Sequence, residues 1–176
     1  DIAQKFNNDF KTNLFPLTKP LIFGEGTRVM SLRDGTKKMS KSDISEYSRI
    51  MLSDSPDQIV QKIKKAKTDP LPLPANTKEA STRPEAFNLL LIFAALKDIS
   101  TENVSQQYAG KEFSLFKKDL SDLVIEKIQP IGKEINKLMK DQLYLDSILM
   151  DGKNKAIVEA DIVLTKVYDI IGLHKY

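Results

Sequence analysis

The segment KKMSKSD, residues 37 to 43, is the part of the sequence whose residue types and spacing best fit a chemical task. Lys38 and Lys41 lie three residues apart, and a lysine ammonium is a compact charge on a long stem that suits polyphosphate oxygens. Ser40, Ser42 and the backbone N–H groups of a curled loop would add neutral donors. Such a loop needs no general base, because it would stabilise the charge that builds up on a departing pyrophosphate. On charge alone, a solvated basic loop is the alternative.

The composition excludes several other kinds of chemistry. The chain has no cysteine, which rules out disulfides, thiolate nucleophiles and cysteine-bound zinc. Its single histidine, His174, lies near the C-terminus, so a serine-hydrolase triad or a metal site built on it is not expected. A net charge of +3 means that contacts with nucleic acid must come from local clusters. No apolar run reaches the roughly 18 residues that span a bilayer, and we expect a soluble protein without a membrane partner.

The first 31 residues are expected to hold the end of a helix followed by extended chain. Residues 1 to 7, DIAQKFN, look like the last turns of an amphipathic helix that nothing precedes, so we expect a piece of something longer. Residues 28 to 31 are the best strand candidate in the segment that follows. The GEG at 24 to 26 lacks the spacing of a dinucleotide fingerprint and is expected to be a turn, as is the DGT at 34 to 36.

The clearest helix signal is SPDQIVQKIKKAKT, residues 55 to 68. Ser55 can cap this helix, Pro56 suits its first position, and Gln58 completes a capping box. We expect this helix to bury one apolar stripe, formed by Ile59, Val60, Ile63 and Ala66. The opposite face is expected to be exposed and basic, with Lys62, Lys64, Lys65 and Lys67. The lysines fit either a solvated face that complements the helix dipole or a patch that contacts phosphates, and the residues leave both interpretations open.

The remainder of the sequence predicts mainly helices. Residues 69 to 84 contain four prolines and no periodicity, so we expect an extended loop that divides the chain in two. Beyond it, apolar spacing predicts a small bundle with helices over about 84–98, 101–109, 114–128, 130–140 and 143–171. We expect Pro130 to begin a helix, Gly152 to interrupt or kink the last one, and Leu115, Ile131 and Met139 to face inward.

The residues KMSKS at 38 to 42 match the signature loop of class I aminoacyl-tRNA synthetases. The longer stretch RVMSLRDGTKKMSKSD resembles bacterial-type tryptophanyl-tRNA synthetases in particular. The resemblance continues in order through KIKKAKTD, RPEAFNLLLIFAAL, FSLFKKDLSDLVIEKIQPI and DGKNKAIVEADIVLTKVYDIIGL, so it covers essentially the whole chain. Two departures are Gly35, where many members have proline, and the proline-rich segment at 70 to 74.

The resemblance implies roles for individual residues. Lys38 and Lys41 would hold the phosphates of ATP and stabilise pyrophosphate as tryptophan is adenylated. Met39, Ser40 and Ser42 would complete the nucleotide loop, and the backbone of Val29 would contact adenine. The helical half looks like the anticodon-binding region for tryptophan tRNA, toward which Lys62 and Lys65 are candidate contacts. ATP would enter with Mg²⁺ as a substrate complex, and no tightly bound cofactor is implied.

The same resemblance defines what this chain lacks. The family's HIGH motif, its G-x-D-Q stretch and most of its tryptophan pocket lie upstream of DIAQKFN, so we expect the chain to be inactive alone. Residues 1–54 would be the end of the Rossmann-type catalytic domain, and 55–176 the helical anticodon-binding domain, with a connecting helix at 55–68, a loop at 69–84 and a bundle at 85–176. The family is homodimeric through its catalytic half, which leaves a monomer open for this piece. A non-catalytic tRNA-binding module and a tyrosyl-tRNA synthetase fragment are the alternatives, although RVMSL argues against the latter.

Overall fold

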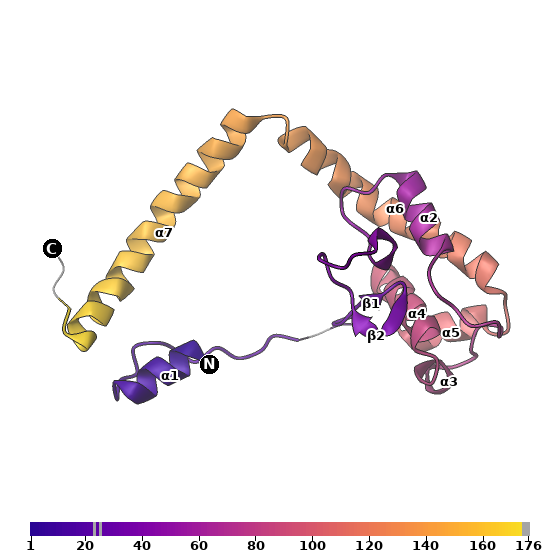
Figure 1. The fold of residues 1–176 in the computed structure, drawn as a ribbon, viewed down its shortest axis with the longest axis horizontal. Coiled ribbons are helices and arrows are strands. Elements are labelled where there is room, and N and C mark those ends of the chain that lie inside the picture. Colours follow the sequence, from indigo (N-terminus) through magenta and orange to yellow (C-terminus); the bar gives the residue numbers. More distant parts are fainter. Residues whose placement is uncertain (23, 25, 174–176) are drawn as a thin grey trace. The chain divides into compact units, whose positions relative to one another are not determined.

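The structure is a computed structural model that describes residues 1–22, 24 and 26–173. The middle of the predicted GEG turn and His174 therefore lie outside the described residues. The described chain is mainly helical, as predicted, with one short β-hairpin (Figure 1). Its elements are α1 (Ile2–Asp9), β1 (Met30–Ser31), β2 (Asp34–Lys38), a 3-10 turn η1 (Glu46–Ser48), α2 (Pro56–Lys64), α3 (Thr77–Ser81), α4 (Pro84–Lys97), α5 (Thr101–Tyr108), α6 (Phe113–Leu138) and α7 (Gln142–Ile171).

The chain forms two compact units. The terminal unit contains Asp1–Leu21 and Leu138–Tyr176, and the central unit contains Ile22–Lys137. The central unit thus spans the boundary that the sequence analysis places between residues 54 and 55. It also contains the whole of segment 69–84, so that loop does not separate the compact units. The division at 54/55 remains a prediction about function.

The terminal unit begins with the predicted helix, α1. Phe6 packs against Phe10 and Phe15, with ring centroids 4.7 and 5.1 Å away. The Asn7 amide donates to the Phe15 carbonyl at 2.7 Å, and its oxygen accepts from the Phe15 N–H at 3.1 Å. These contacts fold the chain back on the helix directly after it ends.

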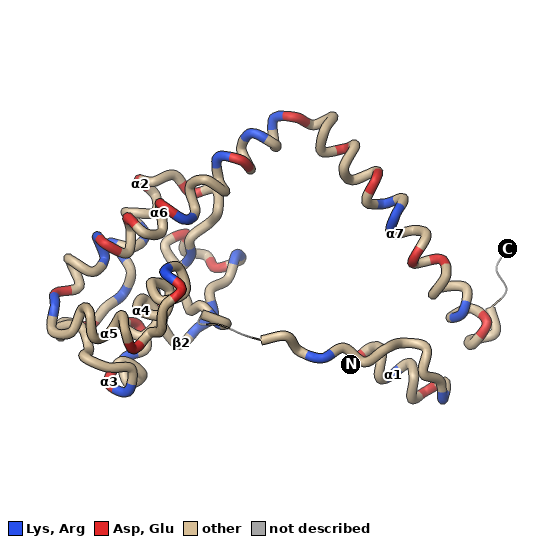
Figure 2. The backbone as a smooth tube through the Cα atoms, turned by 180° about the vertical axis from the view of Figure 1, so that it is seen from behind, with Lys and Arg blue, Asp and Glu red and all other residues tan. Residues whose placement is uncertain are grey.

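Helix α7, the other helix of the terminal unit, runs without interruption through Gly152, so the predicted kink is wrong. A Cβ at Gly152 would meet nothing within 4 Å, and one glycine costs a helix only about 1 kcal/mol. The helix ends at Gly172, whose φ of 74° is the left-handed conformation that glycine favours. Along α7, which is described in full, no residue is buried, and charges of both signs are mixed along it (Figure 2).

The β-hairpin lies at the start of the central unit. Met30 pairs with Lys38 and Ser31 with Asp34 in antiparallel register. The predicted strand over residues 28–31 is therefore formed by its last two residues. The predicted DGT turn is wrong, because those residues begin β2 and the chain instead turns at positions 32 and 33, where Leu32 is buried.

Helix α2 begins as predicted, with the Ser55 and Gln58 side chains forming a reciprocal capping box. Ile59 and Ile63 are fully buried, whereas Val60 is 41% exposed. The predicted exposure of Lys62 is wrong, since this residue is only 7% exposed. Lys62 lies three residues after Ile59, which places it on the buried stripe of the helix.

Segment 69–84 is more ordered than predicted. It contains α3, which Asn76 caps by accepting from the Glu79 N–H at 2.9 Å. Leu73 is buried, and its backbone exchanges hydrogen bonds with Lys111 and Gly110 between α5 and α6. Prolines remove periodicity from a sequence but do not prevent such packing.

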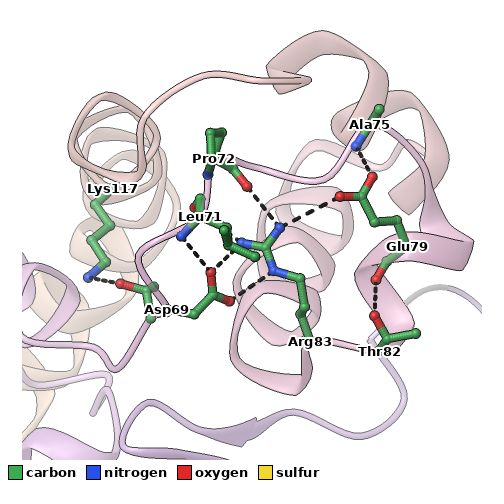
Figure 3. Close-up of polar contacts among 9 residues, drawn as sticks. Asp69, Leu71, Pro72, Ala75, Glu79, Thr82, Arg83 and Lys117 are labelled. Atoms are coloured by element: carbon green, nitrogen blue, oxygen red, sulfur yellow. Dashed lines mark hydrogen bonds and ion pairs between the residues drawn. The ribbon is translucent and has the colours of Figure 1, made fainter.

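The turn-rich segment 69–84 is also held by Arg83. Its guanidinium makes a bidentate pair with Asp69 at 2.9 and 2.6 Å and donates to the carbonyls of Leu71 and Pro72 at 3.2 and 2.8 Å (Figure 3). The Arg83 pairing holds the pKa of the Asp69 carboxyl below its usual range. Bidentate charge-assisted bonds are stronger than neutral ones, which explains how a proline-rich segment keeps one conformation.

Helices α4, α5 and α6 form the main core of the central unit. Phe93, Tyr108 and Phe116 meet there with ring centroids 4.8 to 5.5 Å apart. Other fully buried members of this core are Leu89, Leu90, Val104, Leu120 and Val124. The core therefore draws on the three predicted helices that follow the segment 69–84.

Helix α6 continues through Pro130, so the prediction that Pro130 begins a new helix is wrong. Beyond the proline, Gly132 is buried and faces the Leu52 carbonyl, whose oxygen would lie only 2.5 Å from a Cβ at this position. The small residue at position 132 thus lets this part of the helix approach the backbone of Leu52. Three residues predicted to face inward are instead exposed, namely Leu115 (46%), Ile131 (47%) and Met139 (59%).

Candidate functional site: a basic cavity beside the hairpin

A cavity of about 300 Å³ lies beside the β-hairpin in the central unit. Five of the six residues predicted to bind the nucleotide line it, namely Val29, Lys38, Met39, Ser40 and Lys41. The sixth, Ser42, is not among the lining residues but is bonded to one of them. Gly26, Thr27, Arg28, Arg49, Ile50 and Met51 complete the lining. The structure therefore gathers the predicted residues at one place.

The hairpin positions the first lysine of this cavity. Lys38 is the last residue of β2 and lies opposite Met30 of β1. The Met39 N–H then donates to the Val29 carbonyl at 3.1 Å, which holds the start of the loop beside the chain before β1. Because the pairing with Met30 and the bond made by Met39 fix the backbone at Lys38 and directly after it, this lysine is presented from a defined point.

The two serines of the loop are bonded to each other. Their hydroxyl oxygens lie 3.0 Å apart, and the Ser42 N–H donates to the Ser40 hydroxyl at 3.3 Å. The Asp43 N–H contacts the Ser40 carbonyl at 3.5 Å. The loop is thus curled between Ser40 and Asp43, which is the geometry that lets Lys38 and Lys41 line the same cavity.

The lining of this cavity is basic. Arg28, Lys38, Lys41 and Arg49 contribute four cationic side chains, and no aspartate or glutamate is among its described lining residues. Cations that share one concave surface raise the local potential and attract anions. The lysines provide mobile charges, whereas arginine offers a planar set of donors. The arrangement is suited to binding a polyphosphate.

Arg49 is a member of this lining that the sequence analysis missed. One of its terminal nitrogens donates to the carbonyls of Asp43 and Ser45, at 2.9 and 3.3 Å, directly after the curled loop. Its Nε is buried without a hydrogen-bond partner among the described residues. A lone arginine in the run YSRI carries no spacing signal, so only the folded chain shows this contact.

The hairpin rests on the first turns of α4. A Cβ at Gly35 of β2 would lie 2.5 Å from the backbone of Pro84, so only glycine permits this approach. Lys67 pairs with Glu85 at 2.8 Å, and this bond, with a smaller contribution from the Gly35 backbone, holds the pKa of Glu85 below its usual range. On the same helix, Asn88 binds the backbone of Met30. Asn88, too, was missed in the sequence.

The two lysines predicted to contact tRNA differ from each other, and neither lines the cavity. Lys62 forms a buried ion pair with Asp54, and both side chains are 8% exposed. Lys65 is exposed, and its ammonium lies over the Tyr47 ring at 4.1 Å from the centroid. Only Lys65 is therefore available to an outside partner in this conformation.

Across residues 1–22, 24 and 26–173, no group of three His, Cys, Asp or Glu side chains is placed to hold a metal ion. Over the same residues, no helix is both long and apolar enough to cross a membrane.

Comparison with known proteins assigns the chain to a family. The family described as tRNA synthetases class I (W and Y) matches residues 1–129, and the chain belongs to it. Its curated relatives include tryptophan–tRNA ligases. The ligase of Caulobacter vibrioides is 51% identical over 173 residues, and that of Mesorhizobium japonicum is 45% identical over 192 residues. Both comparisons cover 98% of this chain but only 50% and 54% of the relatives, so the chain spans about half their length.

The chain is also similar to solved structures of tryptophanyl-tRNA synthetases. The crystal structure of tryptophanyl-tRNA synthetase from Mycoplasma pneumoniae aligns with a TM-score of 0.79 and 27% identity, covering 99% of this chain and 51% of that one. The enzyme from Campylobacter jejuni, complexed with ADP and tryptophan, aligns with a TM-score of 0.65 and 27% identity, covering 98% of this chain and 52% of that one. The predicted resemblance to tryptophanyl-tRNA synthetases is confirmed.

Proposed function

We propose that the chain is part of a tryptophan–tRNA ligase, which activates L-tryptophan with ATP to tryptophanyl-AMP and transfers it to tryptophan tRNA. The observation that carries the proposal is the cavity in which Lys38 and Lys41 meet two arginines, with no acidic residue among its described lining residues. The relatives support it, since those compared above are tryptophan–tRNA ligases. The Campylobacter structure adds support because it was solved with ADP and tryptophan.

The proposed chemistry assigns the loop to the first step. The tryptophan carboxylate attacks the α-phosphorus of ATP, a new oxygen–phosphorus bond forms, and the bond to the β-phosphate bridging oxygen breaks. The electron pair leaves with pyrophosphate, and Lys38 and Lys41 stabilise the charge that develops on it. Val29, Met39, Ser40 and Ser42 complete the nucleotide site. ATP enters with Mg²⁺ as the substrate complex.

The proposal treats the chain alone as catalytically inactive. Adenylation requires two substrates in one geometry, and the relatives contain about as much chain again as this sequence. Residues 1–54 are assigned to the end of the catalytic domain and 55–176 to the anticodon-binding domain. The complete enzyme is proposed to be a cytoplasmic homodimer, whereas this chain could remain monomeric.

The loop assignment can be tested on the 176-residue chain with magnesium pyrophosphate as the probe. In titrations followed by ¹⁵N NMR, Lys38→Ala and Lys41→Ala are each expected to weaken binding by about ten- to a hundredfold, because a hydrogen bond to a charged group contributes about 1.5–3 kcal/mol. Lys37→Ala is the matched control, since it removes the same charge at the neighbouring position of β2, where Lys37 pairs with Asp34 and does not line the cavity. Equal losses in all three variants would indicate general charge attraction and would refute the assignment.

A role in tRNA binding is the second proposal, and it is favoured by a separate groove. Lys64, Lys117 and Lys118 line a cavity of about 470 Å³ between α2 and α6, together with one acidic residue, Asp122. The Lys117 ammonium donates to the carbonyls of Lys64 and Ala66, and the exposed Lys65 directly follows Lys64 in the chain. Basic side chains beside a concave surface are the pattern expected for contacts with RNA phosphates. Binding of tryptophan tRNA should weaken as salt is raised, and Lys65→Ala should reduce the salt dependence while Lys78→Ala on α3 leaves it unchanged. Binding that is insensitive to salt would count against this role.

A further inference from the structure

Asn88 on α4 makes an unusual contact with β1. The Met30 N–H donates to the Asn88 amide oxygen at 2.9 Å, and the Asn88 amide nitrogen donates to the Met30 carbonyl at 2.9 Å. The same nitrogen reaches the Ser31 carbonyl at 3.5 Å. Asn88 is only 2% exposed. The side chain therefore bonds both backbone groups of one strand residue, as a neighbouring strand would.

The residue that Asn88 holds is the partner of a proposed catalytic lysine. Met30 lies opposite Lys38 in the hairpin, and the flanking Val29 carbonyl accepts from the Met39 N–H at 3.1 Å. Asn88 is thus bonded to the residue that lies opposite Lys38 in the hairpin. Because β1 contains only two residues, the hairpin itself offers few other bonds to fix its register.

The same helix supports the other strand independently. Gly35 of β2 packs against the backbone of Pro84 and Glu85 at the start of α4, where a Cβ would come within 2.5 and 2.6 Å. Helix α4 therefore contacts β2 near its start and β1 through Asn88. Two separate contacts fix the orientation of the hairpin as well as its position.

We propose that Asn88 is a positioning residue for Lys38, holding β1 so that the lysine is presented to the phosphate cavity. Without the amide, Met30 loses both of its bonds to α4, and the hairpin gains freedom to shift or turn. Placement matters for this kind of site because small displacements of a charged group cost affinity. The inference rests on the proposed function, since it concerns the binding of pyrophosphate by Lys38.

A double-mutant cycle tests whether Asn88 acts through the lysine. Magnesium pyrophosphate is titrated into the wild-type chain, Asn88→Ala, Lys38→Ala and the double variant. Asn88→Ala is expected to weaken binding about tenfold, a coupling of usual size for residues that act together. The double variant is expected to bind no more weakly than Lys38→Ala alone. Losses that multiply, or an Asn88→Ala variant that binds as the wild type does, would overturn the proposal.

Controls separate positioning from general destabilisation. Val104→Ala removes volume from the buried core at α5, so it should lower the melting temperature without changing pyrophosphate binding. Should Asn88→Ala fail to fold, Asn88→Asp keeps the acceptor for the Met30 N–H and loses the donor to its carbonyl. The Asn88→Asp variant is then expected to bind magnesium pyrophosphate more weakly than Val104→Ala does, when the two are compared at the same folded fraction. Equal binding by the two would contradict the positioning role.

A measurement without ligand distinguishes this inference from the proposed function. The Met39 N–H, bonded to Val29, should exchange with solvent at least several-fold faster in Asn88→Ala than in Val104→Ala. If the wild-type chain does not bind pyrophosphate, the proposed function fails, while faster exchange would still show that Asn88 holds the loop. If exchange is unchanged by Asn88→Ala, the positioning role is refuted whatever the chain binds.

Discussion

Replacing Lys62 by methionine is expected to lower the free energy of unfolding by about 3–5 kcal/mol, the usual cost of breaking a buried ion pair from one side. Lys62 and Asp54 are each 8% exposed, so removing the ammonium leaves a carboxylate in a place with little water. That carboxylate keeps a bond from the Met51 N–H at 2.8 Å, which favours the lower end of the range. Methionine retains most of the apolar stem, so the loss comes mainly from the charge.

The measurement is urea unfolding of the central unit, with Lys127→Met as the matched control. Lys127 pairs with Glu126 at 3.0 Å but is 46% exposed, and exposed pairs contribute little, so this control should leave stability nearly unchanged. The double variant Asp54→Leu with Lys62→Met should recover part of the loss, because no charge remains unpaired. A loss below about 1 kcal/mol for Lys62→Met would refute the reasoning, since a buried pair should cost several times more. It would instead mean that the Lys62 ammonium reaches solvent, as the sequence pattern suggested.

Three further predictions concern the packing of the same unit. Gly35→Ala places a Cβ 2.5 Å from the Pro84 backbone, so it should destabilise the protein by about 1–3 kcal/mol and weaken pyrophosphate binding, as thermal unfolding and titration would show. Arg83 holds the pKa of Asp69 below 3.8, so the stability from this pair is present above that pH and is lost as the pH falls through the lowered value. In Arg83→Gln, the free energy of unfolding measured with urea should fall less steeply between pH 5 and pH 2 than in the wild type. An equal fall in both proteins would count against a contribution from this pair. Burial, with a bond to an aspartate, raises the pKa of Tyr108 from 10.0 to about 12, so about 3 kcal/mol of stability should be lost as the pH rises through that window. Tyr108→Phe should remove this alkaline loss, and its persistence would assign the loss to another group.

Local signals in the sequence predicted the features that depend on neighbouring residues. The capping box of Ser55 and Gln58 forms within four residues, so the start of α2 could be read directly. The residues around Lys38 and Lys41 likewise lie in one short segment, and the structure gathers five of the predicted six around one cavity. What such signals lack is any information about partners that lie elsewhere in the chain.

The errors follow from those distant partners. Lys62 looked exposed because Asp54, which neutralises it, lies outside the helix. A local rule predicts a helix start at Pro130, whereas α6 runs through this residue and Gly132 packs against the backbone of Leu52. Asn88 binds a strand residue 58 positions away, and no spacing in the sequence could reveal that pair. Contacts between residues far apart in the sequence are therefore harder to predict than features formed within one short segment.

The central claim is that the curled loop handles pyrophosphate in tryptophan activation. The most direct measurement is tryptophan-dependent ATP–pyrophosphate exchange by this chain joined to the amino-terminal half of the Caulobacter vibrioides ligase, of which the chain covers 50%. We expect exchange by the joined protein, a loss of about a hundredfold or more with Lys41→Ala and little change with Lys37→Ala. Removing one group that stabilises transition-state charge typically costs that much. Exchange that is unaffected by Lys41→Ala would contradict the central claim.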